Sequence, residues 1–302
     1  PPSPRTIGPF TSAIWRHYFQ EKPLTANVKT YGPWGTGEYD FKIYGYCPEE
    51  YYTGQLLEDW EISPDKVIWH VRPGVYWHDH MPWVMEGREV VADDLVAYLH
   101  WYRDGDAGAA FKTMAGGDIH ATGRYTLEIE MTKIDPYGLL YKVGWEDRST
   151  VMPPESIKAS DEWENQVGTG AFRFKELVLG SHMRLERNPN YWDTMTIDGV
   201  EYQLPFLDEV MCVIIKDDAT ALAALQTGKL DLGGYAPPYW DTLRATQLEH
   251  VLFPSAVCAM AVLKVTQPPF DNIDVRRALR IGTDMAAFGT LIGGAQPVNF
   301  YP

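Results

Sequence analysis

A two-residue alternation of apolar and polar side chains indicates strands in the first half of the chain. Residues 67–71 (VIWHV) and 125–131 (YTLEIEM) both follow this period, and each predicts a strand with one face toward water. The alternation resumes over 75–78, just after a Pro-Gly pair at 73–74, which predicts two strands around a turn. These segments indicate a protein that contains at least one sheet.

A helical spacing of apolar residues appears between these strands. Apolar side chains recur on one face over 95–102, and the acidic pair at 93–94 stands where carboxylates cap free N–H groups. We therefore predict a helix over 92–103. The Gly- and Ala-rich stretch 104–123 predicts a mobile loop, and a short helix is predicted near 11–20.

The second half of the chain combines a hairpin with a strand, helix, strand succession. Alternating residues within 172–187 predict the hairpin, and the uninterrupted apolar run 210–215 predicts a strand buried on both faces. Asp217 then caps a helix that Gly228 closes, and a new strand is predicted from Lys229. This succession predicts a βαβ unit with a parallel pair of strands.

The last part of the chain predicts a turn at 268–272 (PPFDN) followed by a helix with Val275, Ala278 and Leu279 on one side. One helix and some twenty residues bury too little surface for a domain. We therefore expect the C-terminal domain to be incomplete.

Composition narrows the classes of function. The chain has 302 residues, with 41 acidic and 26 basic side chains and a formal net charge of −15. Such a charge repels phosphate backbones and anionic membrane surfaces, so no nucleic-acid partner is predicted. Aromatic residues make up 13% of the chain, a content that suits both a wide ligand cleft and a large core.

Cysteine usage and hydropathy give no sign of a disulfide framework or a membrane span. Cys47, Cys212 and Cys258 form no C-x-x-C pair, and each is interpreted as a small buried hydrophobe, with a Cys47 or Cys258 bridge left open. No run reaches the roughly 18 apolar residues of a spanning helix. A secretion signal or lipidated cysteine is expected only upstream of this sequence.

Several motifs, taken in order, resemble family 5 of the extracellular solute-binding proteins, the receptors of oligopeptide and dipeptide ABC importers. The matching segments are LLEDWEIS (56–63), WHVRPGVYWHD (69–79), GREVVADDLV (87–96), VGTGAF (167–172), RNPNYWD (187–193), LPFLDEV (204–210), AALQTGKLD (223–231) and PPFDNIDVRRAL (268–279). Each motif is weak alone, but together they cover about residues 55 to 290.

This resemblance implies an α/β fold of the two-lobed periplasmic-binding-protein type II, in the class with an extra inserted domain. Residues 1–45 and 165–265 would form lobe I, 46–164 the inserted domain, and 266–302 the start of a truncated lobe II. The ligand would lie in an interlobe cleft that closes by a hinge motion.

The preferred ligand-binding residues are aromatic. Tyr235, Tyr239 and Trp240 follow the last predicted strand of the βαβ unit, where open α/β sheets place their ligands. Further candidates are Trp145 and the pair Tyr31 and Trp34. A packed surface loop or an ordinary core position remains the alternative for each of them.

Two other kinds of site were weighed. His78, Asp79 and His80 could suggest a metal site, but on a strand residue 79 points away from the two histidines and no third ligand is recognisable, so no metal and no cofactor are predicted. The acidic pairs at 93–94 and 217–218 could suggest glycoside hydrolysis, but both stand at helix starts, where capping explains them.

The sequence therefore predicts a monomeric, non-enzymatic receptor that binds a peptide or similar small solute and delivers it to a membrane ABC permease. It would be periplasmic or extracellular, with a lipid anchor in the full-length protein as one alternative. A secreted carbohydrate-active hydrolase with an aromatic, acidic groove is the alternative from another class, and a sensory receptor without an importer is a third. The ligand is not fixed by these residues.

Overall fold

The computed structural model of the chain describes residues 16–32, 47–79, 81, 83–105, 108–133, 135, 138–145, 149–158, 165–233, 239–249, 262–284 and 287. The chain divides into two compact units. The first comprises Pro1–Ile214 with Phe253–Ala256, and the second comprises Ile215–Leu252 with Val257–Pro302.

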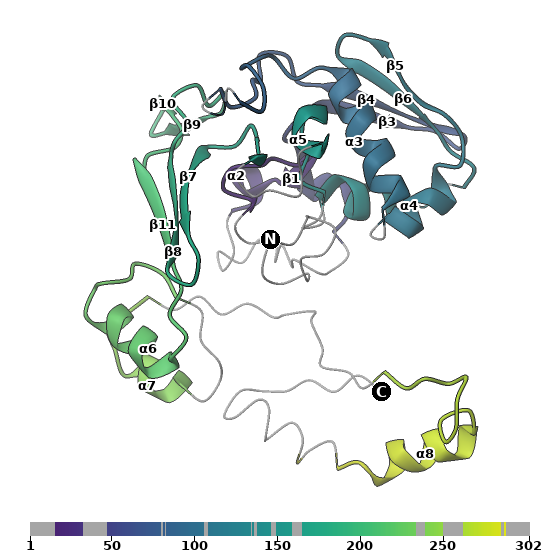
Figure 1. The fold of residues 1–302 in the computed structure, drawn as a ribbon, viewed down its shortest axis with the longest axis vertical. Helices are drawn as coiled ribbons and strands as arrows, with labels where there is room; N and C mark the ends of the chain where they lie inside the picture. The colour runs from purple at the N-terminus through teal and green to yellow at the C-terminus, as the bar shows by residue number, and fades with distance from the viewer. Residues whose placement is uncertain are drawn as a thin grey trace. The chain divides into compact units, whose positions relative to one another are not determined.

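A four-stranded antiparallel sheet lies in the first unit, in the order β3-β4-β6-β5 (Figure 1). Strands β3 (Leu57–Ile62) and β4 (Lys66–Val71) pair along their length, and β6 (Thr126–Glu130) lies on the other side of β4 next to β5 (Ile119–Gly123). Helix α3 (Ala92–Asp104) packs beside β5 and β6. The strands predicted around 67–71 and 125–131 and the helix predicted over 92–103 are confirmed.

Two predictions in this region are wrong. Residues 75–78 form no second strand, because their pairing with the 88–90 segment is limited to one isolated bridge, between Tyr76 and Glu89. The stretch predicted as a mobile loop, 104–123, contains α4 (Ala109–Met114) and strand β5. Apolar anchors decide this outcome, since Phe111, Met114 and Ile119 are all buried.

A second sheet of the first unit has the order β11-β8-β7. The predicted hairpin is confirmed as β7 (Phe172–Val178) and β8 (His182–Arg187). Strand β11 (Glu209–Val213) pairs antiparallel with β8. The prediction that this strand is buried on both faces is wrong, because Met211 and Val213 are 50% and 38% exposed.

Short elements make up the rest of the described part of the first unit. Its two small antiparallel sheets pair β1 with β2 and β9 with β10. The bounds are β1 (Leu24–Ala26), α2 (Val28–Tyr31), η1 (Glu49–Tyr51), β2 (Tyr52–Gly54), η3 (Gly138–Trp145), α5 (Pro154–Lys158), β9 (Thr194–Ile197) and β10 (Val200–Gln203). Element η3 is a π-helix.

One continuous hydrophobic core joins distant parts of the first unit. It contains Phe19 and Leu24 from the N-terminal segment, Trp69 of β4, Tyr98 of α3 and Leu185 of β8. Residues predicted for lobe I and for the inserted domain thus share one core. The proposed division into 1–45 with 165–265, 46–164 and 266–302 stays a prediction.

The second unit contains α6 (Asp218–Gln226), α7 (Trp240–Arg244) and α8 (Ile273–Gly282). The Asp217 carboxylate accepts the Thr220 amide at 2.8 Å, which confirms the predicted cap of α6. The helix predicted after 268–272 is confirmed as α8. Residues 229–233 form no strand and β11 is antiparallel to its partner, so the predicted βαβ unit is wrong for the described residues.

Within the described segments, no helix has the length and apolar content that crossing a membrane requires.

Candidate functional site

The glycine motif at 168–170 lies where several segments of the first unit cross. A Cβ atom on Gly168 would lie 1.8 Å from the carbonyl oxygen of Phe19. The Gly170 amide donates to that same oxygen at 3.0 Å, and the His78 amide donates to the Gly168 carbonyl at 2.9 Å. The Asn188 side-chain amide donates to the Gly170 carbonyl at 3.0 Å. Only glycine permits so close an approach of the N-terminal segment.

Glu21 lies two residues beyond this crossing and is 1% exposed. Its Oε1 accepts the Tyr191 hydroxyl at 3.0 Å, and both carboxylate oxygens accept the Trp192 indole N–H at 3.1 Å. Among the described residues no cation forms an ion pair with it. Burial raises the pKa of the Glu21 carboxyl to about 7, while the bonds from Trp192 and Tyr191 act in the opposite direction.

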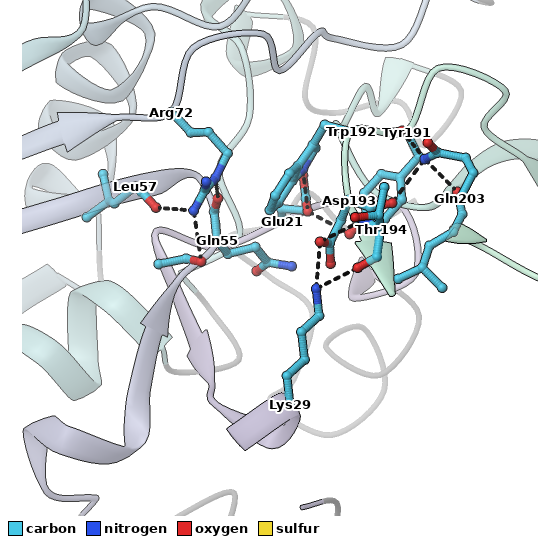
Figure 2. Close-up of polar contacts among 12 residues, drawn as sticks. Glu21, Lys29, Gln55, Leu57, Arg72, Tyr191, Trp192, Asp193, Thr194 and Gln203 are labelled. Atoms are coloured by element: carbon cyan, nitrogen blue, oxygen red, sulfur yellow. Dashed lines mark hydrogen bonds and ion pairs between the residues drawn. The ribbon is translucent and has the colours of Figure 1, made fainter. Parts of the chain in front are cut away.

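Arg72 stacks over the ring of Trp192. Its guanidinium carbon lies 4.5 Å from the centroid of the Trp192 ring. The same side chain donates to the carbonyl oxygens of Gln55 at 3.0 Å, Leu57 at 3.1 Å and Gly54 at 3.4 Å. Arg72 thus fixes the loop between β2 and β3 against the 188–193 turn (Figure 2).

Asp193, the next residue of this turn, contacts the short helix α2. Its Oδ1 accepts the Lys29 ammonium at 2.6 Å and the Thr194 amide at 2.9 Å. Lys29 also donates to the Thr194 carbonyl at 2.9 Å. The Gln203 side-chain amide donates to the carbonyl oxygens of Tyr191 and Asp193, which holds the turn from its far side. Figure 2 shows these contacts converging on residues 191–194.

An aromatic pair stands at the end of α2. The ring centroids of Tyr31 and Tyr51 lie 4.7 Å apart with an interplanar angle of 66°, an edge-to-face arrangement. Asn27 caps the helix by accepting the Thr30 amide at 3.2 Å, and its own amide donates to the Tyr51 carbonyl at 2.9 Å. Both tyrosines are half-buried and pack against the hydrophobic core of the first unit.

The structure describes only part of the predicted aromatic site. Tyr239 is partly buried and packs against the cluster of Leu222, Leu225 and Leu243 in the second unit. Tyr235 and Trp34 lie outside the described residues, as does the side chain of Trp240.

Trp145 occupies a core position in the π-helix η3. It is 7% exposed and lies edge-to-face with Tyr52 and Tyr141, at centroid distances of 5.5 and 6.0 Å. Lys22 donates to its carbonyl oxygen at 2.9 Å. This placement matches the core alternative weighed for Trp145, and its contact with a ligand stays a prediction.

The side chains weighed for other chemistry have structural contacts. The His78 Nε2 lies 3.0 Å from the Gly170 carbonyl oxygen, and no group of three metal-ligating residues occurs among the described ones. His80 lies outside them. Asp94 is buried and accepts the Arg88 guanidinium at 2.7 and 2.8 Å, while Asp217 caps α6. Cys212 is a free thiol, the Cys47 Sγ lies 3.6 Å from the Pro48 carbonyl oxygen, and Cys258 is outside the described residues.

Sequence reasoning missed Glu21, Lys29 and Arg72 as partners of the 191–194 turn. The motif RNPNYWD marked the turn itself, because Asn and Asp side chains bond nearby backbone. No spacing rule connects Glu21 to a residue 171 positions away. No local signal marked Glu21 either, since its sequence neighbours Gln20 and Lys22 are both polar.

Comparison with known proteins identifies relatives along most of the chain. Residues 52–302 match the family described as "Bacterial extracellular solute-binding proteins, family 5 Middle". The chain is 25% identical over 251 residues to the periplasmic oligopeptide-binding protein OppA of Haemophilus influenzae, and 26% identical over 261 residues to OppA of Escherichia coli. It is also 25% identical over 256 residues to the probable deoxycholate-binding periplasmic protein YgiS of Escherichia coli.

These alignments cover 75 to 76% of this chain and 44% of each relative. The chain thus spans less than half the length of the curated relatives that it matches.

Solved structures share the fold at lower sequence identity. The Helicobacter pylori protein DppA, in complex with the peptide STSA, has a TM-score of 0.67 and 18% identity, with 96% of this chain and 56% of that chain covered. The oligopeptide-binding protein AppA of Bacillus subtilis, in complex with a nonapeptide, has a TM-score of 0.69 and 18% identity, with 99% and 55% covered. The predicted α/β fold of the periplasmic-binding-protein type is confirmed.

Proposed function

Because the chain belongs to family 5 of the bacterial extracellular solute-binding proteins, we propose that it is the solute receptor of an ABC importer. The family match over residues 52–302 is the observation that carries this proposal. A receptor of this kind binds its solute between two lobes, and the closed form delivers the solute to a membrane permease. The bound solute would leave chemically unchanged.

Peptides are the ligand class that the relatives favour. Two of the similar proteins are named for oligopeptide binding, and the fold is shared with structures that hold peptides of four and nine residues. Another relative is named for deoxycholate, and one structural neighbour holds mannopinic acid. We propose a peptide as the ligand, with a small solute of another class as the alternative.

The proposed location is the periplasm or the extracellular space, and the proposed partner is an ABC permease. The names of the relatives support the location, since three of them are periplasmic proteins. A net charge of −15 disfavours contact with nucleic acid and with anionic lipid. A monomeric receptor and a lipid anchor in the full-length protein remain parts of the proposal.

The ligand-binding residues that we propose are Tyr31, Trp34, Trp145, Tyr235, Tyr239 and Trp240. Among those described, Tyr31 is favoured, because it is only half-buried and its ring is fixed in position by Tyr51 and by the helix that carries it. Aromatic rings of this kind provide flat contact area at low cost in conformational entropy.

Every comparison agrees with a binding protein rather than an enzyme, and none supports the hydrolase alternative. The two acidic pairs that suggested hydrolysis have structural roles in the fold. Asp94 binds Arg88, and Asp217 binds the Thr220 amide at the start of α6.

The test is identification of the solute that the full-length protein retains through purification. Native mass spectrometry of the protein, followed by denaturation and sequencing of the released small molecules, should identify short peptides. Release of a single non-peptide solute would show that the ligand is not a peptide. Chemical conversion of an added peptide or glycoside would contradict the receptor function itself.

A further inference from the structure

We propose that Lys29 and Asp193 are positioning residues for ligand recognition, and that they act by fixing helix α2 and its Tyr31 ring. This inference rests on the proposed function, in which Tyr31 contacts the ligand. Neither residue needs to touch the ligand for the effect to occur.

The geometry begins with two neighbouring residues of one turn. Trp192 binds Glu21, and Asp193 binds Lys29, at the two ends of the segment 21–29. Strand β1 lies between these two contacts. The segment is therefore fixed at both ends by consecutive residues of the 188–193 turn (Figure 2).

The two fixed ends differ in strength. The Glu21 end is buried and is held by the indole of Trp192 and the hydroxyl of Tyr191. The Lys29 end is partly exposed, with side-chain exposures of 51% for Lys29 and 22% for Asp193. An ion pair at that exposure adds little to the stability of the whole fold. Its effect is local, on the orientation of α2.

Helix α2 depends on such contacts because it is only four residues long. A helix of this length does not persist on its own, since nucleation is unfavourable. Among the described residues, the contacts that hold α2 are the cap from Asn27, the Lys29 pair, and the packing of Tyr31 on Tyr51 and on the hydrophobic core. Loss of the Lys29 pair leaves the Tyr31 ring with greater freedom, which a ligand must then remove on binding.

The connection from Asp193 to Tyr31 can be measured by a double-mutant cycle. The affinity of the full-length protein for the tripeptide trialanine is determined by calorimetry for the wild type, Asp193→Asn, Tyr31→Ala and the double variant. We expect Asp193→Asn to weaken binding about fivefold, with little change in the midpoint of thermal unfolding. In the Tyr31→Ala background the same substitution should have no further effect.

Three further variants complete the test. Lys29→Arg keeps both the charge and the donor, so it should retain the affinity that Lys29→Met loses. Lys66 forms a comparable exposed pair with Glu128 at 3.5 Å, on a different sheet of the same unit. Lys66→Met should therefore leave the affinity unchanged.

The outcomes separate this inference from the proposed function. Trialanine binding that responds to Tyr31→Ala but not to Asp193→Asn would overturn the inference alone. Equal losses from Asp193→Asn with and without Tyr31 would also overturn it, because the effect would not pass through that ring. Failure of the wild-type protein to bind trialanine would overturn the peptide ligand and the inference together.

Discussion

The indole N–H of Trp192 donates to both carboxylate oxygens of Glu21 at 3.1 Å, across 171 positions of the sequence. The Arg72 guanidinium lies over the face of the same indole, 4.5 Å from the ring centroid. One side chain thus joins the N-terminal segment, the loop after β2 and the 188–193 turn. This connection leads to the first two predictions.

Glu21 should make the stability of the protein depend on pH in the neutral range. Burial raises the pKa of this carboxyl in the folded state to about 7, from an ordinary value of 4.5. Between these values the folded state holds a proton that the unfolded state has released, so the contribution is complete below pH 4.5 and is lost as pH rises through 7. It amounts to at most about 3 kcal/mol.

Urea unfolding of the wild type and of Glu21→Gln at pH 5 and pH 8 measures this contribution of Glu21 to the free energy of unfolding. The wild type should lose more stability over the interval than the variant does. The carboxylates with lowered pKa, such as those of Glu89 and Glu209, titrate below pH 4.5 and leave the comparison unaffected. Identical pH dependence in the two proteins would contradict the prediction.

Removing the indole N–H should destabilise the first unit without removing the ring. Trp192→Phe keeps an aromatic face for Arg72 but leaves the buried Glu21 carboxylate with one donor fewer, at a cost of about 1–3 kcal/mol. The matched control is Trp83→Phe, because Trp83 is 67% exposed and its N–H donates to Asn165 at the surface. That change should stay within about 0.5 kcal/mol. Equal losses in urea unfolding of both variants would refute the role of the buried bond.

A methyl group at the glycine crossing should be poorly tolerated. In Gly168→Ala the new Cβ meets the Phe19 carbonyl oxygen at 1.8 Å, so backbone must move, and we expect a loss of about 3 kcal/mol. Gly282→Ala is the control, since nothing lies within 4 Å of a Cβ at that position. Calorimetric unfolding should show a lower midpoint for the first variant only. An unchanged midpoint for Gly168→Ala would show that the crossing is looser than described.

Arg88 should be needed for the start of α3. It binds Asp94 through two hydrogen bonds at 2.7 and 2.8 Å, and it also reaches Glu155 of α5 at 3.1 Å. Arg88→Met leaves the buried Asp94 carboxylate without its cation, which costs about 3–5 kcal/mol. Arg124→Met removes an exposed partner of Glu89 and should cost about 0–1 kcal/mol. Chemical denaturation of both variants measures the two losses of stability. A larger loss for Arg124→Met than for Arg88→Met would contradict the prediction.

Local sequence patterns determined the strands and helices in which buried side chains recur at a regular spacing. The period-two runs at 67–71 and 125–131 became β4 and β6, and the helical spacing after Asp93 became α3, because one face of each meets the core. Capping chemistry likewise located the start of α6 at Asp217. The ordered motifs indicated the family, since they record side chains that this fold requires.

Tertiary structure alone decided which strands pair and which polar groups meet. Residues 75–78 have a strand pattern, but they form only one isolated bridge, between Tyr76 and Glu89. Residues 210–213 are uniformly apolar, yet alternate side chains of β11 face solvent. Glu21 gained its donors, and Lys29 its carboxylate, from a turn more than 160 positions away. Such contacts form only when distant segments pack around a shared core, and no local sequence period encodes that packing.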